Sequence, residues 1–276
     1  MPDVYYQFVP NKIKIQGQPA TFFSRPALGD LTEQITSAQL LDEWTRLASD
    51  AHVLCMHCGP GLAGLTAAHQ VSEGRVALID SHTVAVEAAR RTLNANQAHS
   101  VEVLLGDCGQ PVRGQVFDHV LALLPKGRAA WQQTILDAAQ LLRVDGMFYL
   151  AGANRSGIKS AAKYIKRLFG HVNVLGYRGG CRILSASKTS QYSTPSVESA
   201  DDYYTWRTTK AEVGDKTLVY ATKPGLFSWK GLDQGTRLLL ETLLAHPLLP
   251  DDRVWDIGCG GGPLALLAAR QANRGH

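Results

Sequence analysis

The sequence predicts an α/β protein with a Rossmann-like, doubly wound parallel sheet, duplicated in tandem and truncated in its second copy. Short apolar runs alternate with helical stretches between residues 51 and 188, a spacing typical of parallel strands joined by helices. A glycine-rich segment at residues 53–61 recurs at residues 254–262, an offset of 201 residues. Repetition on this scale indicates two related domains.

The strands of the first copy are predicted from five short apolar runs, because strands buried on both faces form continuous apolar segments. These runs are residues 52–55, 76–79, 101–105, 116–124 and 147–151. The helical stretches between them are residues 62–70, 83–95 and 129–142. A further helix is expected at residues 31–48, where Asp30 or Thr32 would cap the first turn.

A polar stretch divides the chain. Residues 188–200 are rich in Ser and Thr and contain Pro195, a composition typical of a linker or long loop. We therefore predict a first domain at residues 1–190, a linker at 191–215 and the start of a second domain at 216–276.

Composition and charge narrow the class of protein. A net charge of +4 suits a nucleic-acid partner without requiring one. No apolar run approaches the roughly 18 residues that cross a bilayer, and the amino terminus lacks the apolar segment of a secretory signal. Five cysteines without an export signal indicate reduced thiols, so we expect a cytoplasmic protein with no membrane partner.

The second glycine-rich segment, VWDIGCGGG, predicts a cofactor-binding turn between a strand and a helix. Its glycines, Gly258, Gly260 and Gly262, permit positive φ angles and let a ligand approach the main chain. Asp256 can accept hydrogen bonds from an ammonium group, such as that of the methionine part of S-adenosylmethionine. Pro263 suits the first turn of the following helix. The pattern resembles the signature of class I methyltransferases.

The first copy, VLCMHCGPG, has lost these features. Cys55 replaces the acid and His57 replaces the first glycine, so side chains would fill the cofactor space. Asp80 stands where an acid would hold ribose hydroxyls, and Asp107 is placed to lie near an adenine. Residues 121–128, LALLPKGR, lack the Asn-Pro-Pro-aromatic motif of amino-methylating enzymes. We interpret the first domain as a non-catalytic relic.

Two other interpretations of this segment are less favoured. Gly59, Gly61 and Gly64 fit GxGxxG and are followed by Asp80, which would suit a nicotinamide oxidoreductase. The register against the second copy argues against it. A metal site built on residues 55–58 and Cys108 would need a second pair of ligands at zinc-site spacing, and none is apparent. We predict no metal.

A longer resemblance names the family. Residues 224–244, PGLFSWKGLDQGTRLLLETLL, followed by RVWDIGCGGG, resemble the tandem-domain bacterial ribosomal RNA guanine-N2 methyltransferases. Residues 124–128, 151–160 and 177–184 resemble their first domain. The resemblance implies a carboxy-terminal domain that binds S-adenosylmethionine and methylates a guanine amine in ribosomal RNA. It also implies a decayed amino-terminal duplicate that assists folding and RNA binding.

The resemblance assigns cofactor-binding roles to seven residues of the second domain. They are Asp233, Gly235, Thr236, Asp256, Gly258, Gly260 and Gly262. At the same offset the ribose-binding acid would fall near position 281 and the catalytic motif near position 325, both beyond His276. We therefore expect a split gene or a partial sequence that is inactive alone.

Basic and aromatic residues suggest where ribosomal RNA or a ribosomal subunit would bind. The basic candidates are Lys126, Arg128, Arg155, Lys159, Lys163, Lys166 and Arg167. A plain solvated helix face explains several of them equally well. The aromatic residues Tyr203, Tyr204 and Trp206 would stack on bases or pack against a neighbouring domain. The alternative function is a non-catalytic pseudo-methyltransferase that binds RNA or a partner.

Overall fold

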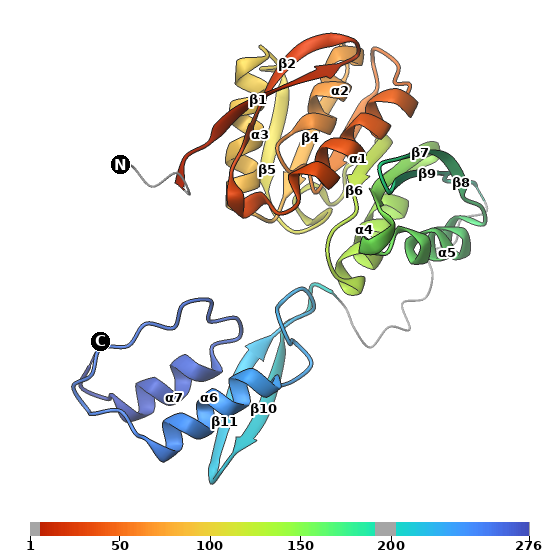
Figure 1. Ribbon diagram of the computed structural model, residues 1–276. Coiled ribbons are helices and arrows are strands. Elements are labelled where there is room, and N and C mark those ends of the chain that lie inside the picture. Colours follow the sequence, from red (N-terminus) through yellow and green to blue (C-terminus); the bar gives the residue numbers. More distant parts are fainter. Residues whose placement is uncertain (1–5, 191–202, 276) are drawn as a thin grey trace. The chain divides into compact units, whose positions relative to one another are not determined.

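The computed structural model describes residues 6–190 and 203–275, which belong to two compact units (Figure 1). We call the part at residues 6–190 unit 1 and the part at residues 203–275 unit 2. The first part of the predicted linker, residues 191–202, lies outside the described residues. Its end does not act as a linker, because strand β10 (Arg207–Val213) forms there. None of the described helices is long and apolar enough to cross a membrane.

Unit 1 contains a seven-stranded sheet in the order β5-β4-β3-β6-β7-β9-β8, in which only β9 runs antiparallel to its neighbours. The strands are β3 (His52–Met56), β4 (Arg75–Asp80), β5 (Val101–Leu105), β6 (Phe117–Leu123), β7 (Leu142–Ala153), β8 (Asn173–Arg178) and β9 (Cys181–Ser187). The order reverses between β3 and β6, as in doubly wound folds. This topology confirms the predicted Rossmann-like α/β class.

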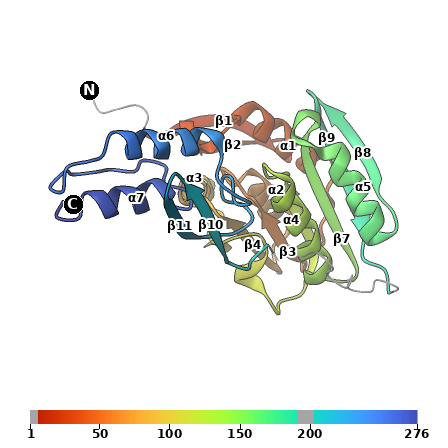
Figure 2. The same cartoon turned by 90° about the horizontal axis from the view of Figure 1, so that it is seen from below.

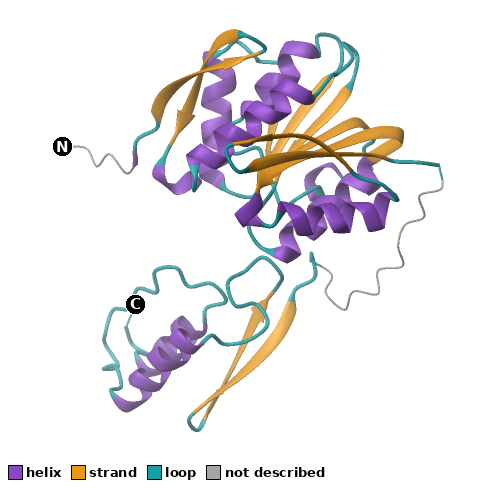
Figure 3. Ribbon diagram, turned by 45° about the vertical axis from the view of Figure 1, so that its right-hand side comes forward, coloured by secondary structure: helices purple, strands orange, loops and turns teal. Residues whose placement is uncertain are grey.

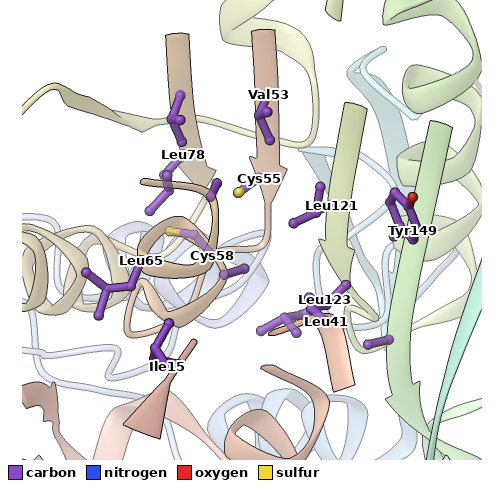
Figure 4. Packing of buried hydrophobic residues seen from close by; sticks show 14 of the residues in the cluster. Ile15, Leu41, Val53, Cys55, Cys58, Leu65, Leu78, Leu121, Leu123 and Tyr149 are labelled. Atoms are coloured by element: carbon purple, nitrogen blue, oxygen red, sulfur yellow. The ribbon is translucent and has the colours of Figure 1, made fainter. Parts of the chain in front are cut away.

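Helices cover both faces of this sheet. Helices α1 (Leu31–Trp44), α2 (Leu62–Gln70) and α3 (Thr83–Ala95) pack on one face, and α4 (Arg128–Leu141) and α5 (Ile158–Phe169) pack on the other. Figure 4 shows the first interface, where Leu78 of β4 lies beside Leu65 of α2 and Val53 and Leu121 lie on the adjacent strands. The predicted helices therefore exist, and Asp30 caps α1 by accepting from Glu33 N at 3.0 Å.

Unit 1 also contains strands that the sequence interpretation did not predict. An amino-terminal hairpin, β1 (Val9–Ile15) with β2 (Gln18–Ser24), packs on α3. The main-chain nitrogen of Phe23 donates to Thr92 Oγ1 at 3.0 Å, which fixes the hairpin on the helix. Strands β8 and β9 extend the sheet beyond β7, with α5 alongside (Figure 2).

Unit 2 consists of a hairpin and two helices (Figure 3). Strand β10 pairs antiparallel with β11 (Lys216–Thr222), and helices α6 (Gln234–Ala245) and α7 (Pro263–Gln271) follow. A small apolar cluster contains the buried residues Val213, Leu218, Leu240 and Leu267.

The strand predicted before the second glycine turn does not form. Residues 253–257 have no strand partner, and Trp255 and Ile257 are 90% and 87% exposed. Their counterparts at the offset of 201 residues, Leu54 and Met56, are buried in β3 between β4 and β6. A parallel strand needs neighbours for its main-chain groups, and the described residues of unit 2 supply none.

From the turn to the end of the following helix, the two glycine-rich segments nevertheless have the same local structure. Helices α2 and α7 are each 9 residues long and start 201 residues apart. Before each helix a main-chain hydrogen bond closes the turn, from Gly61 N to Cys58 O at 2.9 Å and from Gly262 N to Cys259 O at 2.8 Å. At the end of each helix, a Gln side chain accepts a hydrogen bond from the main chain of the segment that follows the preceding helix. Gln70 Oε1 accepts from Leu47 N at 3.0 Å, and Gln271 Oε1 accepts from Leu248 N at 3.1 Å.

Removing a side chain at the two equivalent strand positions should have unequal effects on stability. Leu54→Ala leaves a cavity in a closed core and should lower the free energy of unfolding of unit 1 by about 2–5 kcal/mol. Trp255→Ala removes an exposed side chain and should change that of unit 2 by less than about 0.5 kcal/mol. Urea unfolding followed by far-ultraviolet circular dichroism measures both. Equal losses would show that Trp255 is buried in solution.

Candidate functional site

The glycine turn of unit 2 has a backbone that only glycine adopts easily. The φ angles of Gly258, Gly260 and Gly262 are 80°, 56° and 78°. A Cβ added at any of the three would meet no atom within 4 Å. The absence of side chains here therefore serves to leave the main chain open rather than to relieve crowding inside the unit.

This turn forms one wall of a cavity of about 70 Å³. Five of the seven predicted cofactor-binding residues line it, namely Asp233, Thr236, Asp256, Gly258 and Gly260. The other two, Gly235 and Gly262, are sequence neighbours of lining residues and lie in or just before α6 and α7. The sequence did not single out Tyr220 of β11 or Phe227 and Ser228 of the following loop, which also line the cavity.

Asp233 reaches the cavity as the N-cap of α6. Its Oδ2 accepts from Thr236 N at 3.1 Å and its Oδ1 accepts from Thr236 Oγ1 at 2.6 Å. These hydrogen bonds lower the pKa of the Asp233 carboxyl below its usual value, because they stabilise the charged form. The carboxylate is therefore negative at neutral pH.

Asp256 supplies a second carboxylate at the start of α7. Its Oδ2 accepts from Ala265 N at 3.1 Å, in the first turn, where the helix dipole favours a negative charge. The ring of Tyr220 lies against the turn, since a Cβ on Gly261 would be 2.9 Å from Tyr220 Cδ2. The cavity thus combines two carboxyl groups, an open main chain and the rings of Tyr220 and Phe227, an arrangement suited to a ligand with an ammonium group and hydroxyls.

Unit 1 repeats the backbone of this turn with different side chains. His57, Gly59 and Gly61 have φ angles of 53°, 52° and 84°, and they stand 201 residues before Gly258, Gly260 and Gly262. A histidine therefore adopts the left-handed conformation at the first position, which costs backbone strain that glycine avoids.

The space over the turn of unit 1 is occupied by Gln34 of α1. Its Oε1 lies 2.6 Å from where a Cβ of Gly59 would be, and its Nε2 donates to Leu28 O. Asp80 is also engaged, with Oδ2 accepting from Gly59 N at 3.0 Å and Oδ1 accepting from His82 N at 2.9 Å. Asp80, the acid that stands where ribose hydroxyls would bind, thus accepts two main-chain hydrogen bonds in this structure.

Cys55, Cys58 and Cys108 are buried in unit 1, and His57 lies beside Cys108. The His57 ring shares a hydrogen bond with Thr134 Oγ1 at 2.7 Å, and burial lowers its pKa, which favours the neutral imidazole. Burial raises the pKa of the Cys55 thiol to about 12 and also raises that of Cys108. Within residues 6–190 and 203–275, no three His, Cys, Asp or Glu side chains are grouped to hold a metal ion.

A larger cavity, of about 290 Å³, lies at the carboxyl ends of the strands of unit 1. His57 follows β3, Asp80 ends β4 and Lys126 follows β6, and all three line it together with Gln34 and Glu33 of α1. This is the edge of a doubly wound sheet at which ligands bind.

Two ranges of the chain match one family of known proteins. A family model described as the methyltransferase small domain matches residues 23–185 and residues 217–276. The chain belongs to the methyltransferase small domain family. Both glycine turns lie inside the matched ranges of this methyltransferase small domain protein.

Two curated relatives are both named ribosomal RNA small subunit methyltransferase C. The protein from Marinomonas sp. (strain MWYL1) is 33% identical over 159 residues, which are 55% of this chain and 43% of the relative. The protein from Shewanella amazonensis is 33% identical over 159 residues, which are 58% of this chain and 44% of the relative. The chain therefore spans less than half the length of these relatives.

A solved structure shares the fold. It is described as a T. thermophilus 16S ribosomal RNA N2 methyltransferase in complex with AdoMet and guanosine. The match has a TM-score of 0.73 and covers 97% of this chain and 67% of that chain. At 24% identity, this likeness establishes the fold of the methyltransferase small domain protein and nothing further.

The predicted basic residues lie in two settings. Lys159, Lys163, Lys166 and Arg167 are exposed on α5, and Lys126 and Arg128 are exposed before and at the start of α4. Arg155 precedes α5, in a short 3-10 turn (Asn154–Ser156), and pairs with Asp30 and with Glu33. Its charge is therefore balanced by two carboxylates, unlike a freely presented cation.

The Asp233 cap should make the stability of unit 2 depend on acidity. Because the folded pKa is lowered, the stabilisation is present above the unfolded value of 3.8 and is lost as pH falls through the folded pKa. Asp233→Asn keeps a capping oxygen but cannot titrate. Between about pH 5 and about pH 2, the thermal midpoint of unit 2 should fall further in the unaltered protein than in the variant. Parallel curves would contradict the assigned cap.

Proposed function

We propose that the protein is an S-adenosylmethionine-dependent methyltransferase that modifies the exocyclic amine of guanine in ribosomal RNA. The observation that carries this proposal is the cavity of unit 2, where an open glycine turn lies beside the carboxylates of Asp233 and Asp256. The names of the relatives support the substrate class. Such a substrate would place the protein in the cytoplasm.

The residues of the cavity fit one end of this cofactor. Asp256 and Asp233 would hold the ammonium group and hydroxyls, and the main chain of Gly258 and Gly260 would lie against the ligand without an intervening Cβ. A volume of about 70 Å³ accommodates only part of such a molecule, so we assign to it the amino-acid end. When bound, the sulfonium supplies an already activated methyl group. The protein's contribution is alignment of the target amine.

We propose a different role for unit 1. Its turn has the same backbone as that of unit 2, and both lie inside ranges matched by one family model, which supports a duplication. Gln34 covers Gly59 and Asp80 binds the main chain, so we assign no cofactor to unit 1. The cations of α5 support binding of RNA without chemistry as its function.

Cofactor binding can be tested by calorimetric titration of S-adenosylmethionine into the protein. Asp256→Ala should weaken binding about tenfold or more, because it removes a hydrogen-bonded charge. Gly260→Ala should weaken it similarly, because its Cβ would project over the turn. Gly170→Ala is the matched control, since Gly170 has a φ of 82° and no atom within 4 Å of an added Cβ. Equal affinity in all variants, or a loss in Asp80→Asn, would refute the assignment.

The role of α5 can be tested by the salt dependence of binding to ribosomal RNA. Replacing Lys159, Lys163 and Lys166 by Ala should weaken binding and should reduce the slope of log K against log salt concentration by about 2–3. Lys14→Ala, which removes an exposed lysine of β1, should leave the slope within about one unit. An unchanged slope in the triple variant would mean that α5 is an ordinary solvated face.

A further inference from the structure

Aromatic rings and cations contact one another in two groups at a surface of unit 2. The surface is formed by the start of β10 and by the loop between β11 and α6, and we call it the ring–cation surface. It comprises Tyr203, Trp206, Arg207, Lys223, Phe227, Trp229 and Lys230. The loop folds back beside β10, because Arg207 and Trp229 are in contact although 22 positions separate them (Figure 1).

The cations lie over the rings at contact distance. Arg207 Cζ is 5.3 Å from the centroid of the Trp229 ring, and Lys230 Nζ is 5.1 Å from the same centroid. Lys223 Nζ is 5.6 Å from the Tyr203 centroid and 5.8 Å from the Trp206 centroid. Contacts of this kind hold each positive charge beside an aromatic ring.

The rings differ in exposure. The buried ring packs under the loop, and the exposed rings are accessible to a ligand. Tyr203 is 6% exposed and lies under the loop, with its hydroxyl 2.9 Å from where a Cβ of Gly225 would be. Trp206 is 60% exposed and Phe227 is 78% exposed. Of the three aromatic residues that the sequence suggested for base stacking, only Trp206 presents most of its ring to solvent, and Phe227 joins it.

The ring–cation surface reaches the rim of the proposed cofactor cavity. Phe227 lines that cavity together with Ser228 and Gly231 of the same loop. A molecule that stacks on Phe227 would therefore lie next to the proposed cofactor cavity. Phe227 therefore belongs both to the ring–cation surface and to the lining of the cavity.

The charge of this surface fits a polyanion. Residues 203–211 and 222–231 include Arg207, Lys210, Lys223 and Lys230 and no Asp or Glu. Asp201 and Asp202 precede them and lie outside the described residues. A protein partner would be expected to meet a surface with few lysines, since lysine is depleted at interfaces, whereas single-stranded nucleic acid uses rings for bases and cations for phosphates.

We propose that the ring–cation surface binds unpaired nucleotides of RNA, with bases stacking on Trp206 and Phe227 and phosphates lying beside Lys223 and Arg207. This inference rests on the proposed function, because it supplies the flanking contacts of the same RNA substrate. It adds a binding site distinct from the cations of α5, and one that combines ring stacking with charge.

The test is fluorescence anisotropy with a fluorescein-labelled single-stranded RNA of about ten nucleotides, a length within known site sizes. Trp206→Leu and Phe227→Leu should each weaken binding about fivefold or more, because each removes one stacking ring. Tyr177→Leu is the matched control, since Tyr177 is 63% exposed and lies under Arg182 at 4.6 Å. Its affinity should equal that of the unaltered protein. Circular dichroism checks that all variants are folded.

A second probe separates bases from phosphates. An abasic oligomer of the same length and charge should bind the unaltered protein weakly, and the two ring variants should bind it no worse. Equal affinity for RNA and the abasic oligomer, unchanged affinity in both ring variants, or no RNA binding would overturn the proposal. Loss of cofactor binding in the calorimetric titration, with RNA binding still dependent on the rings, would instead refute the proposed function alone.

Discussion

Three left-handed backbone positions in a short turn are the constraint on which the rest of this protein depends. They bring the chain from an extended segment directly into a helix and turn its main chain outward at Gly258, Gly260 and Gly262. The conformation occurs twice at an offset of 201 residues, with the same closing hydrogen bond and a helix of the same length. Backbone geometry therefore persists where the side chains differ.

The side chains decide what each turn can do. In unit 2 the first two positions of the motif are Asp256 and Gly258, which leave a charge and an open surface. In unit 1 the same positions are Cys55, buried in the core, and His57, bonded to Thr134. Gln34 then fills the remaining space over Gly59. The turn of unit 2 is open, whereas the turn of unit 1 is packed against other side chains.

Much of unit 1 could be predicted from the sequence, because fully buried parallel strands and amphipathic helices have strong local patterns. Strands β3 to β6 and helices α2 and α3 match their predicted ranges closely. The hairpin β1–β2 was not predicted, and β10 was assigned to the linker, because half-exposed polar strands resemble loops. The segment at residues 253–257 has a strand pattern but no strand, because pairing depends on neighbours that a local pattern does not contain.

The sequence predicted the residues of the glycine turn and the nearby acids, but not the other residues that line the cavity. Glycines and acids at fixed spacing identify the turn, whereas the contribution of Tyr220 and Phe227 depends on how β11 and its loop fold back. Gln34 lies 25 residues before Gly59, with no motif connecting them. Long-range contacts of this kind come from tertiary packing alone.

The central claim is that the turn at residues 254–262 contacts the cofactor and its counterpart at residues 53–61 does not. Two-dimensional ¹H–¹⁵N correlation spectra recorded while S-adenosylhomocysteine is added report on both turns in one sample. The account predicts that the amide signals of Gly258, Gly260 and Gly262 shift with saturation while those of Gly59 and Gly61 stay in place. Movement of the Gly59 and Gly61 signals instead would contradict it.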